Sequence, residues 1–129
     1  MDSKWQLVLG RVLLSAIFIL SGLGKIPQFS GVAGMMAGKG IPLATVALVI
    51  TLFIEIGGGL MVLTGFKAKY AALVIAIWLV PVTLIFHKFW GLPEPQHTEQ
   101  MINFLKNVAI MGGLLVLASA SPETKSAKA

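Results

Sequence analysis

Residues 43–65 read LATVALVITLFIEIGGGLMVLTG, a mainly apolar stretch with one charged side chain, Glu55. A membrane-spanning helix needs about 20 such residues, because each adds about 1.5 Å of rise against a hydrocarbon layer near 30 Å thick. Backbone groups inside lipid find no water, so a crossing segment has to be helical even where β-branched residues are frequent. The stretch therefore predicts a transmembrane helix with a carboxyl group inside it.

Three further windows of this kind lie at about 5–24, 70–87 and 102–120. The basic turn at 66–69 is so short that the spans on either side of it must be antiparallel neighbours. The chain is therefore predicted to be all-α, an integral membrane antiparallel four-helix bundle.

Two other parts of the chain lack the long apolar pattern of the spans. One is the segment between the first two spans, and the other is the last few residues. A short interfacial helix is predicted between spans 1 and 2, because apolar residues recur there at helical spacing: Phe29, Val32, Met35 and Met36. The last residues are small and charged. We expect one transmembrane domain over 1–121 and a flexible tail over 122–129.

The composition excludes most other classes of protein. Hydrophobic residues make up 57% of the 129 residues and charged ones 12%, where a soluble domain has about 25% charged, and the mean hydropathy is +0.89. So small a body cannot hide that many apolar residues from water, which excludes soluble and disordered proteins. Cysteine is absent, so disulfides, thiolate metal sites and a thiol redox couple are excluded too.

The net charge of +5 does not indicate nucleic acid, because the cations are single or paired residues between long uncharged runs. In a four-span bundle both termini lie on the side of the 66–69 turn, and that side carries more lysines. We expect both termini in the cytoplasm. The residues 22–24 would also suit a signal-peptide cleavage site, but Arg11 inside the apolar run argues against a cleaved leader.

Five ionisable residues lie within the spans or at their ends: Arg11, Lys25, Glu55, His87 and Lys106. An unpaired Arg, Lys or Asp at mid-depth costs about 2.5–3.5 kcal/mol, so such residues need partners. Each of the five shares a helix face with other polar or small residues. The simplest assembly turns these polar stripes inward and the large aliphatic side chains toward lipid.

Depth along the helices predicts which residues meet. Arg11 lies roughly 9 Å and Glu55 roughly 15 Å from the cytoplasmic edge, so an arginine side chain can close the gap. We expect an Arg11–Glu55 pair, either structural or functional. Near the opposite edge we expect an opening of the bundle lined by basic and hydrogen-bonding residues, which we call the mouth. The predicted ligand-binding residues are Arg11, Lys25, Glu55, His87, Trp90, Asn103, Lys106 and Asn107.

Two of these residues, Glu55 and His87, are catalytic candidates because each can exchange a proton. The competing interpretation is that Lys25 and Lys106 extend to the headgroups and that Trp90 anchors the interface. No metal site is predicted, since two histidines ten residues apart make a poor haem site. No nucleotide-binding motif is present either.

Several motifs, in this order, make the sequence resemble the DoxX family, small four-span proteins related to the small subunit of thiosulfate:quinone oxidoreductase. They are RVLL at 11–14, FILSGLGK at 18–25, GIP at 40–42, EIGG at 55–58, FHKFW at 86–90, FLKN at 104–107 and GG at 112–113. The resemblance covers roughly 7–120 and implies a bacterial-type inner-membrane bundle. It carries the family's polar pattern onto Arg11, Lys25, Glu55, His87, Lys106 and Asn107.

The resemblance implies chemistry only weakly, because some relatives act with quinone in sulfur oxidation and others are tied to oxidative-stress complexes. Our first hypothesis is a redox-associated subunit without an intrinsic cofactor, which binds a quinone-like or other amphipathic molecule in the polar pocket. Without cysteine, thiosulfate oxidation would need a partner subunit. Besides the lipid bilayer we therefore expect a partner protein or a second copy.

Two other functions stay open. The alternative is a non-enzymatic adaptor or carrier for a partner protein or lipid, which a chain of this size favours. A proton-coupled transporter ranks third, because four short spans without an inverted repeat offer little machinery for alternating access.

Overall fold

The computed structural model describes residues 2–122, and all regular structure within them is helical. The elements are α1 (Ser3–Lys25), α2 (Phe29–Gly38), α3 (Ala44–Leu52), the π-helix η1 (Phe53–Gly58), α4 (Gly59–Thr64), α5 (Ala68–Phe86) and α6 (Gln96–Ala120). The elements α3, η1 and α4 form one continuous span, so four helices within the described residues are long and apolar enough to cross a membrane. The predicted all-α fold with a short additional helix between the first two spans is confirmed. Beyond Pro122, the predicted flexible tail lies outside the described residues.

The last helix begins at Gln96, whereas the apolar pattern predicts a start near Ile102. The pattern misses the first turns of the helix because their residues are polar. The carboxylate of Glu94 accepts hydrogen bonds from the backbone N–H and the hydroxyl of Thr98, at 3.0 and 2.7 Å. These bonds satisfy a free donor of the first turn and lower the pKa of Glu94. The helix therefore starts in the polar loop and enters the apolar region only near Ile102.

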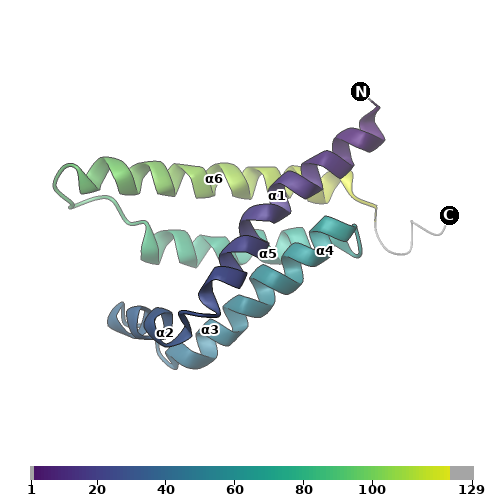
Figure 1. The fold of residues 1–129 in the computed structure, drawn as a ribbon. Coiled ribbons are helices and arrows are strands. Elements are labelled where there is room, and N and C mark those ends of the chain that lie inside the picture. The colour runs from purple at the N-terminus through teal and green to yellow at the C-terminus, as the bar shows by residue number, and fades with distance from the viewer. Residues whose placement is uncertain (1, 123–129) are drawn as a thin grey trace.

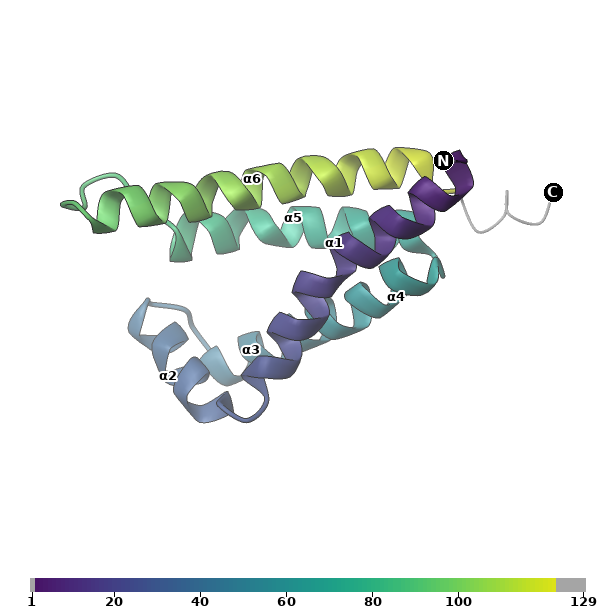
Figure 2. The same cartoon turned by 45° about the horizontal axis from the view of Figure 1, so that its top comes forward.

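The axes of the four spans are not all aligned with one another. Helices α5 and α6 run antiparallel and side by side, whereas α1 crosses them at an angle together with α3, η1 and α4 (Figures 1 and 2). The two pairs converge at the end that holds the N-terminus and the turn before α5. They diverge toward the end that holds α2 and the loop before α6. At the convergent end Lys69 Nζ donates to the carbonyl of Ala118, at 3.3 Å, which joins α5 to the last turn of α6.

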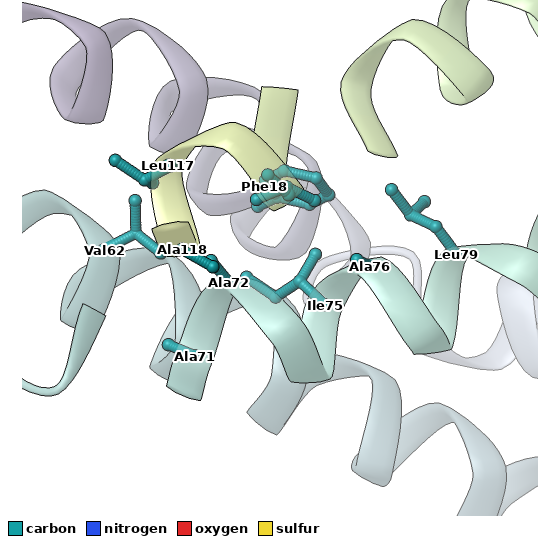
Figure 3. Close-up of a cluster of buried hydrophobic side chains, with 10 residues drawn as sticks. Phe18, Val62, Ala71, Ala72, Ile75, Ala76, Leu79, Leu117 and Ala118 are labelled. Atoms are coloured by element: carbon teal, nitrogen blue, oxygen red, sulfur yellow. The ribbon is translucent and has the colours of Figure 1, made fainter. Parts of the chain in front are cut away.

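The hydrophobic core lies between α1, α4, α5 and α6 (Figure 3). Phe18 of α1, Val62 of α4 and Leu114 of α6 meet there on a face of α5 that contains several alanines. Small side chains on one helix let its neighbours approach closely, which is how helices pack in lipid. Large aliphatic side chains on the opposite faces are exposed, such as Leu20, Ile77 and Leu105. These exposed faces suit contact with acyl chains.

Candidate functional site

A buried ion pair joins α1 to the π-helix. Lys25 Nζ lies 2.8 Å from Glu55 Oε1 and also donates to the Ser21 hydroxyl, at 2.8 Å. The Glu55 side chain is 5% exposed and that of Lys25 is 25% exposed. The acid is therefore enclosed, while the lysine reaches it from a partly open position. The serine one turn earlier on α1 holds the lysine in place.

Glu55 lies on the π-helix itself, between α3 and α4. Such segments are rare in proteins and occur frequently at functional sites, because the wider turn redirects the side chains that it carries. The glycines at 57–59 follow directly in the sequence. Two of them bring this span against its neighbours, since a Cβ on Gly58 would lie 3.1 Å from Ile75 Cδ1 and one on Gly59 would lie 2.7 Å from Ile19 Cγ1.

Close glycine contacts also fix the register of α1 against this span. A Cβ on Gly22 would lie 2.6 Å from Ile56 Cγ1, so α1 passes directly over the residue after Glu55. With Gly22 opposite Glu55 and Ile56, Lys25 is less than one turn away along α1. Arg11 is eleven residues from Gly22 in the other direction, about 16 Å along the helix.

The expected Arg11–Glu55 pair is therefore wrong, and Lys25 takes the place of Arg11. The Arg11 guanidinium lies instead over Gly65, with Nη1 3.1 Å from the position that a Cβ would occupy. Gly65 ends α4 with a φ of +84°, a conformation that favours glycine. A cation here faces the negative end of the helix dipole. The expectation failed because α1 starts before the level at which α4 ends, so Arg11 is not as deep as its sequence position implied.

A second group of polar residues lines a hollow of about 440 Å³ between α1 and the end of the α5–α6 pair. His87, Asn103, Lys106 and Asn107 supply its polar lining, and Ile17, Ala109 and Ile110 supply its apolar lining. Four residues of the predicted mouth thus lie around one space. Ile17 shows that α1 forms one wall of it, although the two charged residues of the ion pair do not line it.

Two hydrogen bonds hold the walls of this hollow. Asn107 Nδ2 donates to the hydroxyl of Thr83, which is 2% exposed, at 3.1 Å. His87 Nδ1 lies 3.0 Å from Gln100 Oε1. Because an amide oxygen only accepts, Nδ1 carries the hydrogen, and Nε2 is the ring atom left to exchange a proton. Within residues 2–122, Lys106 and Asn103 have no hydrogen-bond partner, so their donors are available to a ligand.

The structure places Trp90 away from the hollow. Its ring packs against Phe89 at 5.3 Å and Phe104 at 6.0 Å between centroids, and the Lys88 ammonium lies 5.9 Å from it. This arrangement fits the interface-anchor interpretation. Sequence reasoning missed Gln100 as the partner of His87. Its position three residues before Asn103, on the same face of α6, was the available signal.

The lining has a clear chemical character. It offers ammonium, amide and imidazole donors beside aliphatic side chains, and none of its residues is acidic. Such a set suits a ligand with an acceptor-rich head and an apolar body. In the part of the chain that is described, no group of three or more His, Cys, Asp or Glu side chains is arranged to hold a metal ion.

Comparisons with known proteins agree on one family. The family model of DoxX matches residues 6–88. Among curated relatives, inner membrane protein YphA of Escherichia coli K12 is 30% identical over 116 residues, which cover 90% of this chain and 83% of that protein. Inner membrane protein YqjF of the same organism is 34% identical over 115 residues, with coverages of 89% and 83%.

A more distant relative is the Surfeit locus protein 4 homolog of Schizosaccharomyces pombe. It is 28% identical over 115 residues, which cover 88% of this chain but 33% of that longer protein. No solved structure matches the chain.

Proposed function

The chain belongs to the DoxX family and is a multi-pass inner-membrane protein, and from this premise we propose that it binds a quinone-like amphipathic molecule in the hollow between α1 and the α5–α6 pair. The observation that carries the proposal is the donor-lined wall formed by His87, Asn103, Lys106 and Asn107. In this proposal the ligand enters the hollow from lipid, where such a molecule resides.

The donor set fits a quinone head. Each quinone carbonyl accepts hydrogen bonds, and Lys106 and Asn103 have donors that no described residue uses. Asn107 keeps the remaining donor of its amide after bonding Thr83. On the apolar side, Ile17 and Ile110 can cover the face of the ring. A charged donor makes a stronger hydrogen bond than a neutral one.

When bound, a quinone supplies two-electron chemistry that also takes up protons. In this proposal His87 moves a proton at Nε2 while Gln100 holds Nδ1. The Lys25–Glu55 pair positions α1 and does not touch the ligand, because neither residue lines the hollow. A partner protein supplies the electrons, since the chain has no cysteine and hence no thiol couple of its own.

Binding to purified protein in nanodiscs tests the proposal. A benzoquinone should bind saturably to the wild type, and the double variant Lys106→Met/Asn103→Leu should weaken binding by about tenfold or more, the loss expected for two hydrogen bonds. Lys39→Met is the matched control, because Lys39 is exposed and lies outside the hollow. The absence of saturable binding, or an equal loss in the control, would overturn the proposal. If anionic lipid in the nanodiscs displaces the quinone, the site takes an anionic headgroup instead.

We further propose that both termini face the cytoplasm. Lys4, Lys67 and Lys69 lie at the end of the bundle that holds the N-terminus. The segments at the other end carry Lys25, Lys39 and Lys88, so the difference in positive charge comes from the two further lysines that follow the last span in the sequence, at 125 and 128. In right-side-out spheroplasts of a chain without native cysteine, Glu94→Cys should react with an impermeant maleimide, and Lys67→Cys only after lysis. The reverse pattern would contradict this orientation.

A further inference from the structure

The seam between α1 and α6 contains a second hollow, of about 460 Å³, toward the convergent end of the bundle. Leu7, Gly10 and Leu14 line it from α1, and Gly113, Val116 and Leu117 line it from α6. Gln6 is the one polar residue of this lining, and the rest is apolar, in contrast to the donors of the first hollow. One seam therefore carries a polar hollow and an apolar hollow in succession.

The two hollows share the same helix faces. On α1, Gly10, Leu14 and Ile17 recur at spacings of four and three residues. On α6, Lys106, Ile110, Gly113 and Leu117 follow spacings of four, three and four residues. Gly113 lies at the crossing between the hollows, where a Cβ would be 3.8 Å from Leu14 Cδ1. Glycine at this point leaves the surface of α6 between the two hollows without a side chain, while Leu14 of α1 packs close to it.

The length of the seam matches a lipid-like tail. From Lys106 to Leu117 is eleven residues, about 16 Å along α6. Half the hydrocarbon layer is about 15 Å thick, which is the depth that one acyl chain of a leaflet fills. A head bound at Lys106 would thus have room along the seam for one tail directed toward the convergent end.

We propose that the ligand carries a long apolar tail, and that this tail lies along the α1–α6 seam, past Gly113 and into the second hollow. The inference rests on the proposed binding of an acceptor-rich head in the first hollow, and it specifies the ligand class as a long-tailed amphipath. A short polar solute would leave the second hollow to bulk lipid. A tail continuous with the bound head excludes bulk lipid and contributes its own burial to the affinity.

The test compares two ligands and two matched variants in nanodiscs. The ligands are one benzoquinone head with a ten-carbon tail and the same head without it, both corrected for partition into the bilayer. Gly10→Leu places a side chain in the second hollow, at a position where a Cβ meets no atom within 4 Å. Gly24→Leu is the control, since it makes the same change on the same helix, also in open space, but lines neither hollow.

The tailed quinone should bind the wild type about tenfold more tightly than the bare head. Gly10→Leu should remove most of that advantage and leave the affinity for the bare head unchanged, whereas Gly24→Leu should change neither. Equal affinities of the two ligands, or an unaltered tail advantage in Gly10→Leu, would overturn the inference while the proposed function stands. If neither ligand binds the wild type, the proposed function itself fails, and this inference fails with it. A thermal unfolding curve for each variant separates loss of binding from loss of fold.

Discussion

Helix α1 has two seams, and they are built in opposite ways. Against η1 and α4 it is closed, since Gly22 meets Ile56 and Gly59 meets Ile19 at distances that leave no room for a Cβ. Against α6 it is open, since a Cβ on Gly10 would meet nothing within 4 Å and one on Gly113 would make only ordinary contact. Glycine alone therefore does not mark close packing. The bulk of the residue opposite it decides whether a seam closes.

The polar residues follow the same division. In the closed seam Lys25 is paired with Glu55, although the buried Arg11 Nε beside Gly65 has no hydrogen-bond partner among the described residues. In the open seam Lys106 and Asn103 have no partner among residues 2–122. A paired charge stabilises the assembly, and an unused donor is available to a ligand where it lines a hollow, as Lys106 and Asn103 do and the tightly packed Arg11 does not. We therefore assign the closed seam to structure and the open seam to binding.

Removing Lys25 should have the largest effect on the closed seam. Lys25→Met leaves Glu55 enclosed without a partner, which should lower the free energy of unfolding by about 3–5 kcal/mol. Glu55→Gln should cost less, because Lys25 is partly exposed and can extend to the surface. Unfolding in mild detergent measures both. Recovery in Lys25→Met/Glu55→Leu is the control, and equal costs for the two single variants would contradict the pairing.

Adding one methyl group at matched glycines should sharpen the comparison. Gly22→Ala forces a Cβ against Ile56 and should destabilise the protein by about 1–3 kcal/mol. Gly10→Ala on the same helix meets open space and should stabilise α1 by up to about 1 kcal/mol. Thermal unfolding of the two variants gives the sign directly. Similar destabilisation in both would show that the two seams are packed alike.

An open α1–α6 seam requires that α5 hold α6 in place. Asn107→Leu removes the hydrogen bond to the buried Thr83 hydroxyl and should cost about 0.6–1 kcal/mol. The double variant Asn107→Leu/Thr83→Val should recover part of this loss, because no polar group is then left without a partner. Unfolding curves of the single and double variants measure the coupling. Strict additivity would mean that this bond does not join the helices.

The start of α6 lies outside both seams and should show the smallest effect. Bonds from Thr98 lower the pKa of Glu94, so this carboxylate stabilises the folded state above its ordinary pKa of about 4.3. That contribution is lost as the pH falls through the lowered folded value. Amide exchange in the first turn of α6 should therefore increase in acid, and Glu94→Gln should show faster exchange at neutral pH. Unchanged amide exchange in the variant would contradict the role of Glu94 as a cap of α6.

The sequence predicts the spans well because hydrophobicity and length decide them, as residues 43–65 show. It also identifies His87, Asn103, Lys106 and Asn107 as one group, since three of them share a face of α6 and His87 ends the adjacent helix. It does not predict the partner of Glu55. That partner depends on register, which contacts such as Gly22 with Ile56 set, and no helical period encodes which side chain lies opposite a glycine. Arg11 was misplaced for this reason.

A crystal structure grown from a lipidic mesophase with the ten-carbon-tailed quinone tests the division between the two seams most directly. We expect one elongated density along α1 and α6, with its polar end at Lys106 and Asn103 and its tail beyond Gly113, while Lys25 and Glu55 stay paired. A ligand bound at Glu55, or an α1–α6 seam filled by side chains with the quinone elsewhere, would contradict it.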